Sequence, residues 1–385
     1  MTLHETVEIS KKVSIGAGFA IVVIGVLVLL FRGGVAIKEI LFPRKIQPPT
    51  FAYDVLPPLA FPPNVKEGNF TYTLNTIDGE FPVFPDRLNV FPIVQNEPNF
   101  LNLDKAKQKA AALGFVNRLG TVLPETPLGG VDYQWAEQGG LSRVFTIDIV
   151  NFDFDLTSRF LSSLTVLAAQ DISNQQSAIT STTEFLGLIT LFPDDIDLTK
   201  TSTPDPIENY VTYPELFDIQ NGQLVPATSL SRTKVIRVNL YQKNIEYELI
   251  TGKSDNANVM EKVEQKLPIL YPNPPYSTMS FWVASGDSNP QVMESQFVYQ
   301  EVTREPEVEA SYAIKTPQEA FEELKQGKGY IASYKGDDGE ILINNIFLAY
   351  YMGEDRQQYL MPIIVFEGDN GFFAYISAVR NDWIQ

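Results

Sequence analysis

Few residues in this chain have the types and spacing for covalent chemistry, and the most suggestive is a serine three positions before a lysine. Ser231 and Lys234 are followed by Ser254, Asp255 and Asn256, an order in which some acyl-transfer enzymes place a nucleophilic serine and its proton-transfer partners. That serine must open a helix, whereas SRTKVIRVNLY alternates polar and apolar residues as a strand does. The two elements also lie too close together, so we expect no serine nucleophile.

Carboxylates offer a second kind of chemistry, because they gather at three places. Close acids can begin a calcium site, which needs about six to eight oxygens, or can act as the acid and base of a glycan hydrolase. None of the three places has the spaced aspartates of a calcium loop, so we interpret them as solvated charge and predict no metal and no cofactor. The clusters are Asp153 with Asp155, Asp194 with Asp195 and Asp197, and Asp337 with Asp338 and Glu340.

Composition removes further classes of function. The 385 residues include one histidine, His4, and no cysteine, which excludes histidine-dependent triads, thiolate chemistry and multi-histidine metal sites. The 29 Lys and Arg stand against 47 Asp and Glu, and this net charge of −18 opposes binding to nucleic acid. With 44% apolar residues, the chain can build one or two cores. We therefore expect a protein that is not an enzyme.

The elements that would position any site begin with an apolar segment. Residues 13–31, after a polar tail at 1–12, contain no charge and would span about 28 Å as a helix, which matches a bilayer core. Lys11, Lys12 and Arg32 bracket this segment closely. We predict a single-pass transmembrane helix with the lipid bilayer as a partner, and a cleavable signal peptide is the alternative.

The orientation of this helix follows less directly from charge. Lys11 and Lys12 precede it, whereas four basic residues follow it by residue 45. Long domains cross membranes largely regardless of charge, and a chain without cysteine suits an oxidising compartment. We expect a cell-membrane protein with its large domain outside the cytoplasm, and a cytoplasmic domain is the alternative. Residues 46–385 carry 23 basic against 44 acidic residues.

A proline-rich stretch follows within the juxtamembrane linker, which we place at residues 32–66. Seven prolines between 43 and 63 favour an extended, semi-rigid backbone. Apolar side chains alternate with these prolines, which indicates a strap packed onto its own domain; a PxxP ligand for another protein is the alternative. The apolar residues are Phe51, Tyr53, Leu56, Leu59 and Phe61.

The remainder predicts an α+β fold, with short helices packed on antiparallel sheets and an arrangement compatible with diverged helix-plus-meander repeats. We expect helices over 103–114, 174–192 and 316–326, and a short charged helix over 260–266. Thr316, Pro317 and Glu319 form a capping box with proline at the first helical position. We divide this part into residues 67–303, with a split near 170–215, and residues 304–385.

The last 75 or so residues also carry a family resemblance. The C-terminal helix is followed by strands over 330–334, 341–352, 359–367 and 372–379, separated by glycine-containing turns. This pattern resembles the PepSY-like modules of membrane-anchored regulators such as the YycI and YycH proteins, although Val365 or Phe366 replaces a tryptophan and Ala349 a glycine. The matching positions are Ala320, Phe321, Leu324, Gly327, Ile346, Leu348, Tyr350, Tyr351, Gln358, Tyr359, Leu360, Pro362, Phe372, Ala374, Tyr375, Ala378 and Val379.

The resemblance implies an extracytoplasmic module that acts through protein contacts, in that family on a sensor kinase, and it brings no catalytic residues. We therefore expect a non-catalytic binding or regulatory protein of the cell envelope, with a membrane or envelope protein as partner; a homo-oligomer is compatible. Tyr350, Tyr351, Phe372 and Phe373 are mainly strand core, and any exposed member is a candidate partner contact. The alternatives are a carboxylate-dependent glycan enzyme and a structural component of a surface assembly.

Overall fold

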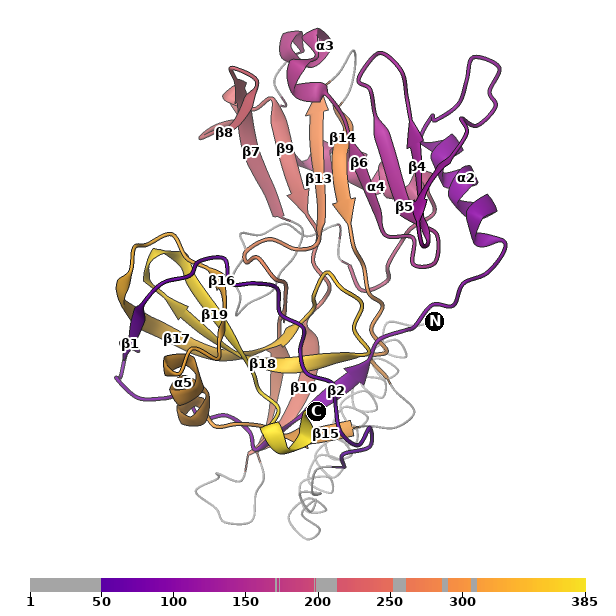
Figure 1. Ribbon diagram of the computed structural model, residues 1–385. Coiled ribbons are helices and arrows are strands. Elements are labelled where there is room, and N and C mark those ends of the chain that lie inside the picture. The colour runs from indigo at the N-terminus through magenta and orange to yellow at the C-terminus, as the bar shows by residue number, and fades with distance from the viewer. Residues whose placement is uncertain are drawn as a thin grey trace, which may run out of the picture. The chain divides into compact units, whose positions relative to one another are not determined.

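The computed structural model describes most of the chain beyond the proline-rich stretch (Figure 1). The described residues are 50–169, 172, 174–196, 198, 213–251, 261–285, 290–305 and 310–385. The chain divides into two compact units, Met1–Pro48 with Glu248–Gln265 and Pro49–Tyr247 with Lys266–Gln385. Strands β10 (Ile245–Thr251) and β11 (Glu261–Leu267) form a two-stranded sheet that shares residues with the first unit. The second unit contains both large sheets.

The protein is built mainly of sheet, which corrects the α+β prediction. Among the residues that the structure describes, strands account for 39% and helices for 18%, and the strands form several sheets. The short charged helix expected over 260–266 is wrong, because this segment is strand β11. Its backbone groups pair with β10, and such a ladder overrides the weak helix propensity of a seven-residue segment.

The larger sheet has nine strands, and every pairing in it is antiparallel. Their order is β3-β4-β5-β6-β14-β13-β9-β7-β8. The strands are β3 (Thr126–Gly129), β4 (Asp132–Ala136), β5 (Val144–Asp148), β6 (Phe154–Thr157), β7 (Tyr213–Gln220), β8 (Gln223–Pro226), β9 (Val235–Asn239), β13 (Met279–Ser285) and β14 (Pro290–Phe297).

Helix α4 (Gln175–Leu188) covers one face of this sheet and packs on β14, β13 and β9. Phe185 is its central contact: the ring lies 6.0 Å from that of Phe154 and 5.9 Å from that of Phe281. Helix α2 (Asn102–Ala112) buries Ala106 and Ala110 in the same core. Both helices agree with the sequence prediction.

The second sheet has eight strands, and its C-terminal meander was also predicted. The core order is β1-β17-β18-β19-β16, with β2, β12 and β15 attached. β1 and β12 run parallel to β17, and the other pairs are antiparallel. The strands are β1 (Phe70–Leu74), β2 (Arg87–Pro92), β12 (Ile269–Leu270), β15 (Ala310–Ala313), β16 (Tyr330–Ser333), β17 (Gly339–Tyr351), β18 (Tyr359–Gly368) and β19 (Phe372–Ser377).

Helix α5 (Pro317–Lys325) packs on one face of the eight-stranded sheet, where the ring of Phe321 lies 6.0 Å from that of Phe366. The predicted capping box is confirmed. The Glu319 carboxylate accepts from the Thr316 N–H at 2.8 Å, and the Thr316 hydroxyl accepts from the Glu319 N–H at 3.2 Å. These bonds satisfy two of the free N–H groups of the first turn.

The described part of the proline-rich stretch, residues 50–66, is packed as the strap interpretation predicted. Phe51 stacks on Trp383 with centroids 3.6 Å apart, and Phe61 stacks on Tyr330 at 5.2 Å. Leu56 is fully buried and donates its N–H to the Trp383 carbonyl at 2.9 Å. This segment is therefore part of the fold rather than a spacer.

The remaining described elements are short helical turns: η1 (Phe160–Ser162), α3 (Leu164–Ala168), η2 (Leu230–Arg232), η3 (Asp369–Gly371) and η4 (Asn381–Trp383). Within the part of the chain that the structure describes, no helix is long and apolar enough to cross a bilayer, and the structure therefore gives no support to the single-pass architecture. The segment at 13–31 on which that expectation depends lies outside the described residues. The boundary expected at residue 304 does not separate the sheets, because β1, β2 and β12 pair with C-terminal strands.

Candidate binding pocket

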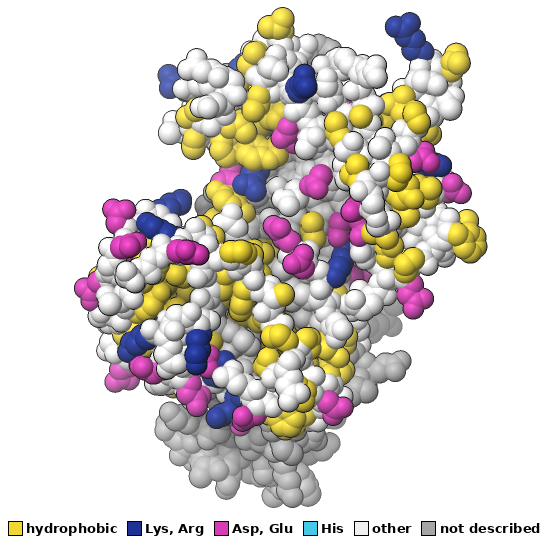
Figure 2. Space-filling model, viewed as in Figure 1, with side chains coloured by type: hydrophobic (Ala, Val, Ile, Leu, Met, Phe, Trp, Pro, Cys, Tyr) yellow, Lys and Arg dark blue, Asp and Glu magenta, His cyan; other side chains and the backbone are white. Residues whose placement is uncertain are grey.

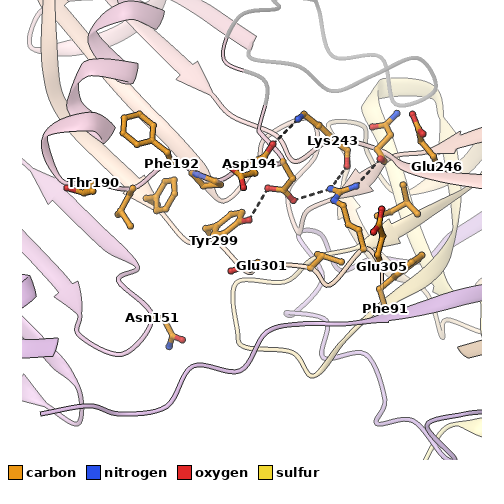
Figure 3. A pocket seen from close by; sticks show the side chains of 18 residues that line it. Phe91, Asn151, Thr190, Phe192, Asp194, Lys243, Glu246, Tyr299, Glu301 and Glu305 are labelled. Carbon is orange, nitrogen blue, oxygen red and sulfur yellow. Dashed lines mark hydrogen bonds and ion pairs between the residues drawn. The ribbon is translucent and has the colours of Figure 1, made fainter. Parts of the chain in front are cut away.

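A pocket of about 740 Å³ lies where the nine-stranded sheet approaches the eight-stranded sheet (Figure 3). Three segments form most of it: the loop after α4, the residues between β9 and β10, and the loop after β14. A cavity of this size is in the range of small-ligand and side-chain sites. Its lining residues are Phe91, Asn151, Thr190, Leu191, Phe192, Pro193, Asp194, Asp195, Lys243, Asn244, Ile245, Glu246, Phe297, Tyr299, Glu301, Val302, Arg304 and Glu305.

Asp195 holds the three segments together. Its carboxylate accepts from the Tyr299 hydroxyl at 2.9 Å, the Gln242 amide at 2.9 Å and the Arg304 guanidinium at 3.0 Å. Its backbone carbonyl also accepts from the Lys243 N–H at 2.6 Å. These bonds engage the carboxylate with three side-chain donors, one of them cationic, so Asp195 serves as the structural acceptor that joins the three segments.

The two terminal nitrogens of Arg304 are also engaged in structure, whereas its buried Nε has no hydrogen-bond partner. Besides Asp195, its guanidinium donates to the Asn244 carbonyl at 3.0 Å and to the Lys243 carbonyl at 2.7 Å. These bonds fix the backbone between β9 and β10 and neutralise the arginine within the protein. Arg304 is therefore not free to attract an anionic ligand.

The Tyr299 hydroxyl faces the same carboxylate. Burial and the charge of Asp195 raise the pKa of Tyr299 far above its ordinary value, because both disfavour a phenolate. The proton therefore stays on the phenol, where it donates to Asp195. This group serves as a hydrogen-bond donor and not as a proton-transfer group near neutral pH.

The rim of the pocket is acidic. Asp194, Glu246, Glu301 and Glu305 are exposed there, and Lys243 is the cation beside them. The Lys243 ammonium donates to the Asp194 carbonyl at 2.8 Å (Figure 3). Since Asp195 and Arg304 neutralise each other, the rim carries an excess of three negative charges.

The floor is apolar apart from one amide. Phe297, Ile245 and Val302 are buried lining residues, and so is Asn244, with 7% of its surface exposed. Neither the amide nitrogen nor the amide oxygen of Asn244 has a hydrogen-bond partner among the described residues. An unsatisfied buried amide costs about 1–3 kcal/mol of stability, so its presence in a pocket points to a ligand.

The structure places the acidic clusters noted in the sequence in different surroundings. Asp194 and Asp195 line the pocket, whereas Asp197 lies outside the described residues. Asp153 forms an ion pair with Arg356, which links β6 to the loop between β17 and β18. Among the described residues, no group of three or more acidic or other ligating side chains is placed to hold a metal.

The predicted aromatic contacts lie in the core. Tyr350, Tyr351 and Phe372 are fully buried, so burial removes them as partner contacts, and only Phe373 is partly exposed. The Tyr350 hydroxyl donates to the Asn89 carbonyl at 2.8 Å, as expected for a core tyrosine.

The serine–lysine element is divided between η2 and the residue before β9, and Lys234 donates to the Ala169 carbonyl at 2.5 Å. Ser254, Asp255 and Asn256 lie outside the described residues. The structure thus brings no element of that motif into the pocket.

Comparison with known proteins adds little. No family model matches the chain, and no curated protein matches it. A solved structure of an uncharacterized protein from Eubacterium rectale ATCC 33656 is similar over 83% of this chain and 92% of that chain, with 10% identity and a TM-score of 0.34. A likeness at this level shows neither a shared fold nor a function.

Proposed function

We propose that this protein is a non-catalytic binding module whose pocket takes a peptide segment with basic and apolar side chains. The observation that carries the proposal is the combination of an acidic rim, an apolar floor and the unsatisfied amide of Asn244. Lysine and arginine have apolar stems and charged ends, so they fit a site with both properties.

Asn244 gives the reason for a peptide as the ligand. A primary amide offers donors and an acceptor side by side, which match the carbonyl and N–H groups of a peptide backbone. A partner that supplies both would satisfy the buried amide and recover the cost of leaving it unpaired. The excess of acidic residues across residues 46–385 would also speed the approach of a basic segment.

Fluorescence anisotropy with two labelled peptides tests this function. One probe alternates lysine with leucine, and the matched probe alternates glutamate with leucine. We expect the first alone to bind, and the double variant Glu301→Lys/Glu305→Lys to weaken it about tenfold or more, equivalent to 1.4 kcal/mol. The matched control Asp337→Lys/Asp338→Lys makes the same charge change in an exposed turn and should cost less than about twofold. Equal losses in both double variants would mean general charge attraction and would overturn the pocket assignment.

A second experiment separates ligand binding from folding. Asn244→Leu removes the unsatisfied amide, so we expect stability to stay level or to rise by about 1–2 kcal/mol, while the lysine–leucine peptide binds more weakly. Urea unfolding and the anisotropy titration measure the two effects. Loss of stability without loss of binding would contradict a ligand-binding role for this residue.

A further inference from the structure

The segment after β14 supplies several residues to the pocket, and one of them, Tyr299, is held by an ion pair that does not itself line the pocket. Asp153, which precedes β6, accepts from the Tyr299 N–H at 3.1 Å. Arg356, in the loop between β17 and β18, donates to the Tyr299 carbonyl at 2.9 Å. Asp153 and Arg356 also pair with each other. We call this arrangement the Tyr299 clamp, because it fixes both polar groups of the Tyr299 backbone.

The clamp is mostly enclosed, and the next residue reinforces it. The side chain of Asp153 is 17% exposed and that of Arg356 is 28% exposed. Gln300 is buried, and its amide donates to the carbonyls of Gly353 at 2.9 Å and Asp355 at 3.0 Å. When an ion pair is largely removed from water, loss of one partner costs more than it does at the surface. The clamp therefore fixes this backbone more firmly than an exposed ion pair would.

The side chain of the clamped residue reaches the centre of the pocket. The Tyr299 hydroxyl donates to Asp195 at 2.9 Å, and Asp195 joins the three segments that form most of the pocket (Figure 3). Glu301, a carboxylate of the rim, lies two residues further along the same segment as Tyr299. A shift of the Tyr299 backbone would therefore move both the hydroxyl that contacts Asp195 and the acidic rim.

The charge of Asp153 depends on its surroundings. Two charged side chains face it: Arg356 from the loop between β17 and β18, and Asp148 from the end of β5. Burial raises the pKa of Asp153 above its ordinary value of 3.8, and this effect exceeds the opposing effects of Arg356 and the Tyr299 N–H. Asp153 therefore gains a proton at a higher pH than a solvated aspartate does. A protonated Asp153 no longer attracts Arg356 as an ion-pair partner.

We infer that Asp153 and Arg356 are positioning residues of the pocket, and that protonation of Asp153 converts the pocket to a state that binds its peptide more weakly. They act through Tyr299: the ionised pair holds this residue where its hydroxyl reaches Asp195. The inference rests on the proposed function, because it concerns regulation of the same pocket. The protein would then release its ligand in acidic surroundings.

Anisotropy titrations with the lysine–leucine peptide test the clamp through the sign of one effect. Acidic side chains gather where the two large sheets approach each other (Figure 2), so general charge attraction predicts tighter binding of a basic peptide when Arg356→Gln removes a cation. The clamp predicts the opposite, a loss of about fivefold or more at about pH 7. The matched control is Arg159→Gln, the same substitution at an exposed arginine outside the clamp, and it should change the Kd by less than about twofold.

The pH dependence of Asp153→Asn tests the switch. The asparagine keeps an oxygen that can accept from the Tyr299 N–H but cannot ionise. We expect the Kd of this variant to exceed that of the natural chain about fivefold at about pH 7, and the ratio to approach one as pH falls through the pKa of Asp153 in the folded protein. The rim carboxylates titrate in both proteins, so their effect cancels from the ratio. Asp155→Asn, the same substitution at an exposed residue of β6, should give a ratio near one throughout.

The possible failures are distinguishable. If the natural chain binds the peptide but Arg356→Gln binds it equally well or more tightly, the inference is wrong and the peptide-binding proposal stands. A ratio for Asp153→Asn that does not change with pH would overturn the switch in the same way. Absence of peptide binding by the natural chain would overturn the proposed function and this inference with it. Circular dichroism of each variant separates loss of binding from loss of folding.

Discussion

The two large sheets differ in how many of their faces are covered by other segments. The eight-stranded sheet is packed on one face by α5 and on the other by the strap at residues 50–66, through contacts centred on Phe321 and Phe61. The nine-stranded sheet has α4 on one face, and among the described helices η1 and α3 lie at one end of the other face. The first sheet is therefore covered on both faces, whereas the described helices cover the second sheet on one face and at one end of the other.

The burial patterns of single strands reflect this difference. In β18, seven consecutive residues from Leu360 to Phe366 are buried, as expected for a strand covered on both faces. In β6, Phe154 and Leu156 are buried while Asp155 and Thr157 are exposed, as expected for a strand covered on one face. Core packing thus involves seven consecutive residues of β18 but only alternate residues of β6.

The largest effect should come from removing the cover supplied by α5. Phe321→Ala deletes a ring that contacts Phe366 and Phe81, and we expect a loss of about 3–5 kcal/mol in the free energy of unfolding. Urea denaturation measures this. The exposed neighbour Glu322→Ala should change stability by less than about 0.5 kcal/mol. A small effect of Phe321→Ala would mean that α5 is not needed as a cover.

The strap should come second. Leu56→Ala opens a cavity beneath the strap, and we expect a cost of about 2–5 kcal/mol. The control is Val55→Ala, because Val55 is adjacent in sequence but 41% exposed. Limited proteolysis should also cut the strap earlier in the Leu56→Ala variant than in the control. Equal stability of the two variants would show that the strap is an accessory and that the eight-stranded sheet needs only one cover.

Local signals in the sequence predicted much of the eight-stranded sheet. The capping box at Thr316, the glycine turns and the apolar alternation of the meander each depend on residues close in the chain, and all were predicted correctly. The attachment of β1 to β17 was not predicted, because this parallel pair joins Phe70 to Gly339 and leaves no local pattern. The excess of sheet over helix was missed for a similar reason, since a short charged segment such as β11 carries no strong signal of its own.

The pocket was not predicted from the sequence. Asp194 and Asp195 were noted together with Asp197 as an acidic cluster and interpreted as solvated charge. The partners of Asp195 were not predicted, because Gln242, Tyr299 and Arg304 lie 47, 104 and 109 residues further along the chain. No spacing rule connects such positions. Asn244 is ordinary in sequence, and only its burial without a hydrogen-bond partner makes it a candidate binding residue.

A smaller effect on stability is expected at the N-terminal cap of α5, the helix that covers one face of the eight-stranded sheet. Thr316→Ala removes the hydroxyl that accepts from the Glu319 N–H, and we expect a loss of about 1 kcal/mol. Thr316→Ser retains the hydroxyl and should recover most of the loss. Urea denaturation of the three proteins measures the difference. If serine fails to recover stability, the threonine methyl group rather than the cap is responsible.

The smallest effect should come from Glu294, on the face of the nine-stranded sheet opposite α4, and it depends on pH. Burial raises the pKa of Glu294 above its ordinary value of 4.5, so the folded protein holds this proton more tightly than the unfolded chain does. The stability that comes from this tighter proton binding is therefore fully present below pH 4.5. It is lost as pH rises through the pKa of Glu294 in the folded protein. Glu294→Gln cannot ionise and still offers an oxygen to the Ser158 N–H.

We therefore expect Glu294→Gln to gain stability relative to the natural chain as pH rises above 4.5, by less than about 1 kcal/mol because the side chain is partly hydrated. Urea denaturation across pH 4–8, a range of about four units, measures this change in stability. The control is Thr157→Ala on the adjacent strand. Its stability should differ from that of the natural chain by the same amount at every pH, since threonine does not titrate. A flat profile for Glu294→Gln would mean that water reaches this face as freely as it reaches the unfolded chain. Neighbouring residues would then not shield the Glu294 carboxyl group from water. A ligand at this face would have to displace all of the water bound there.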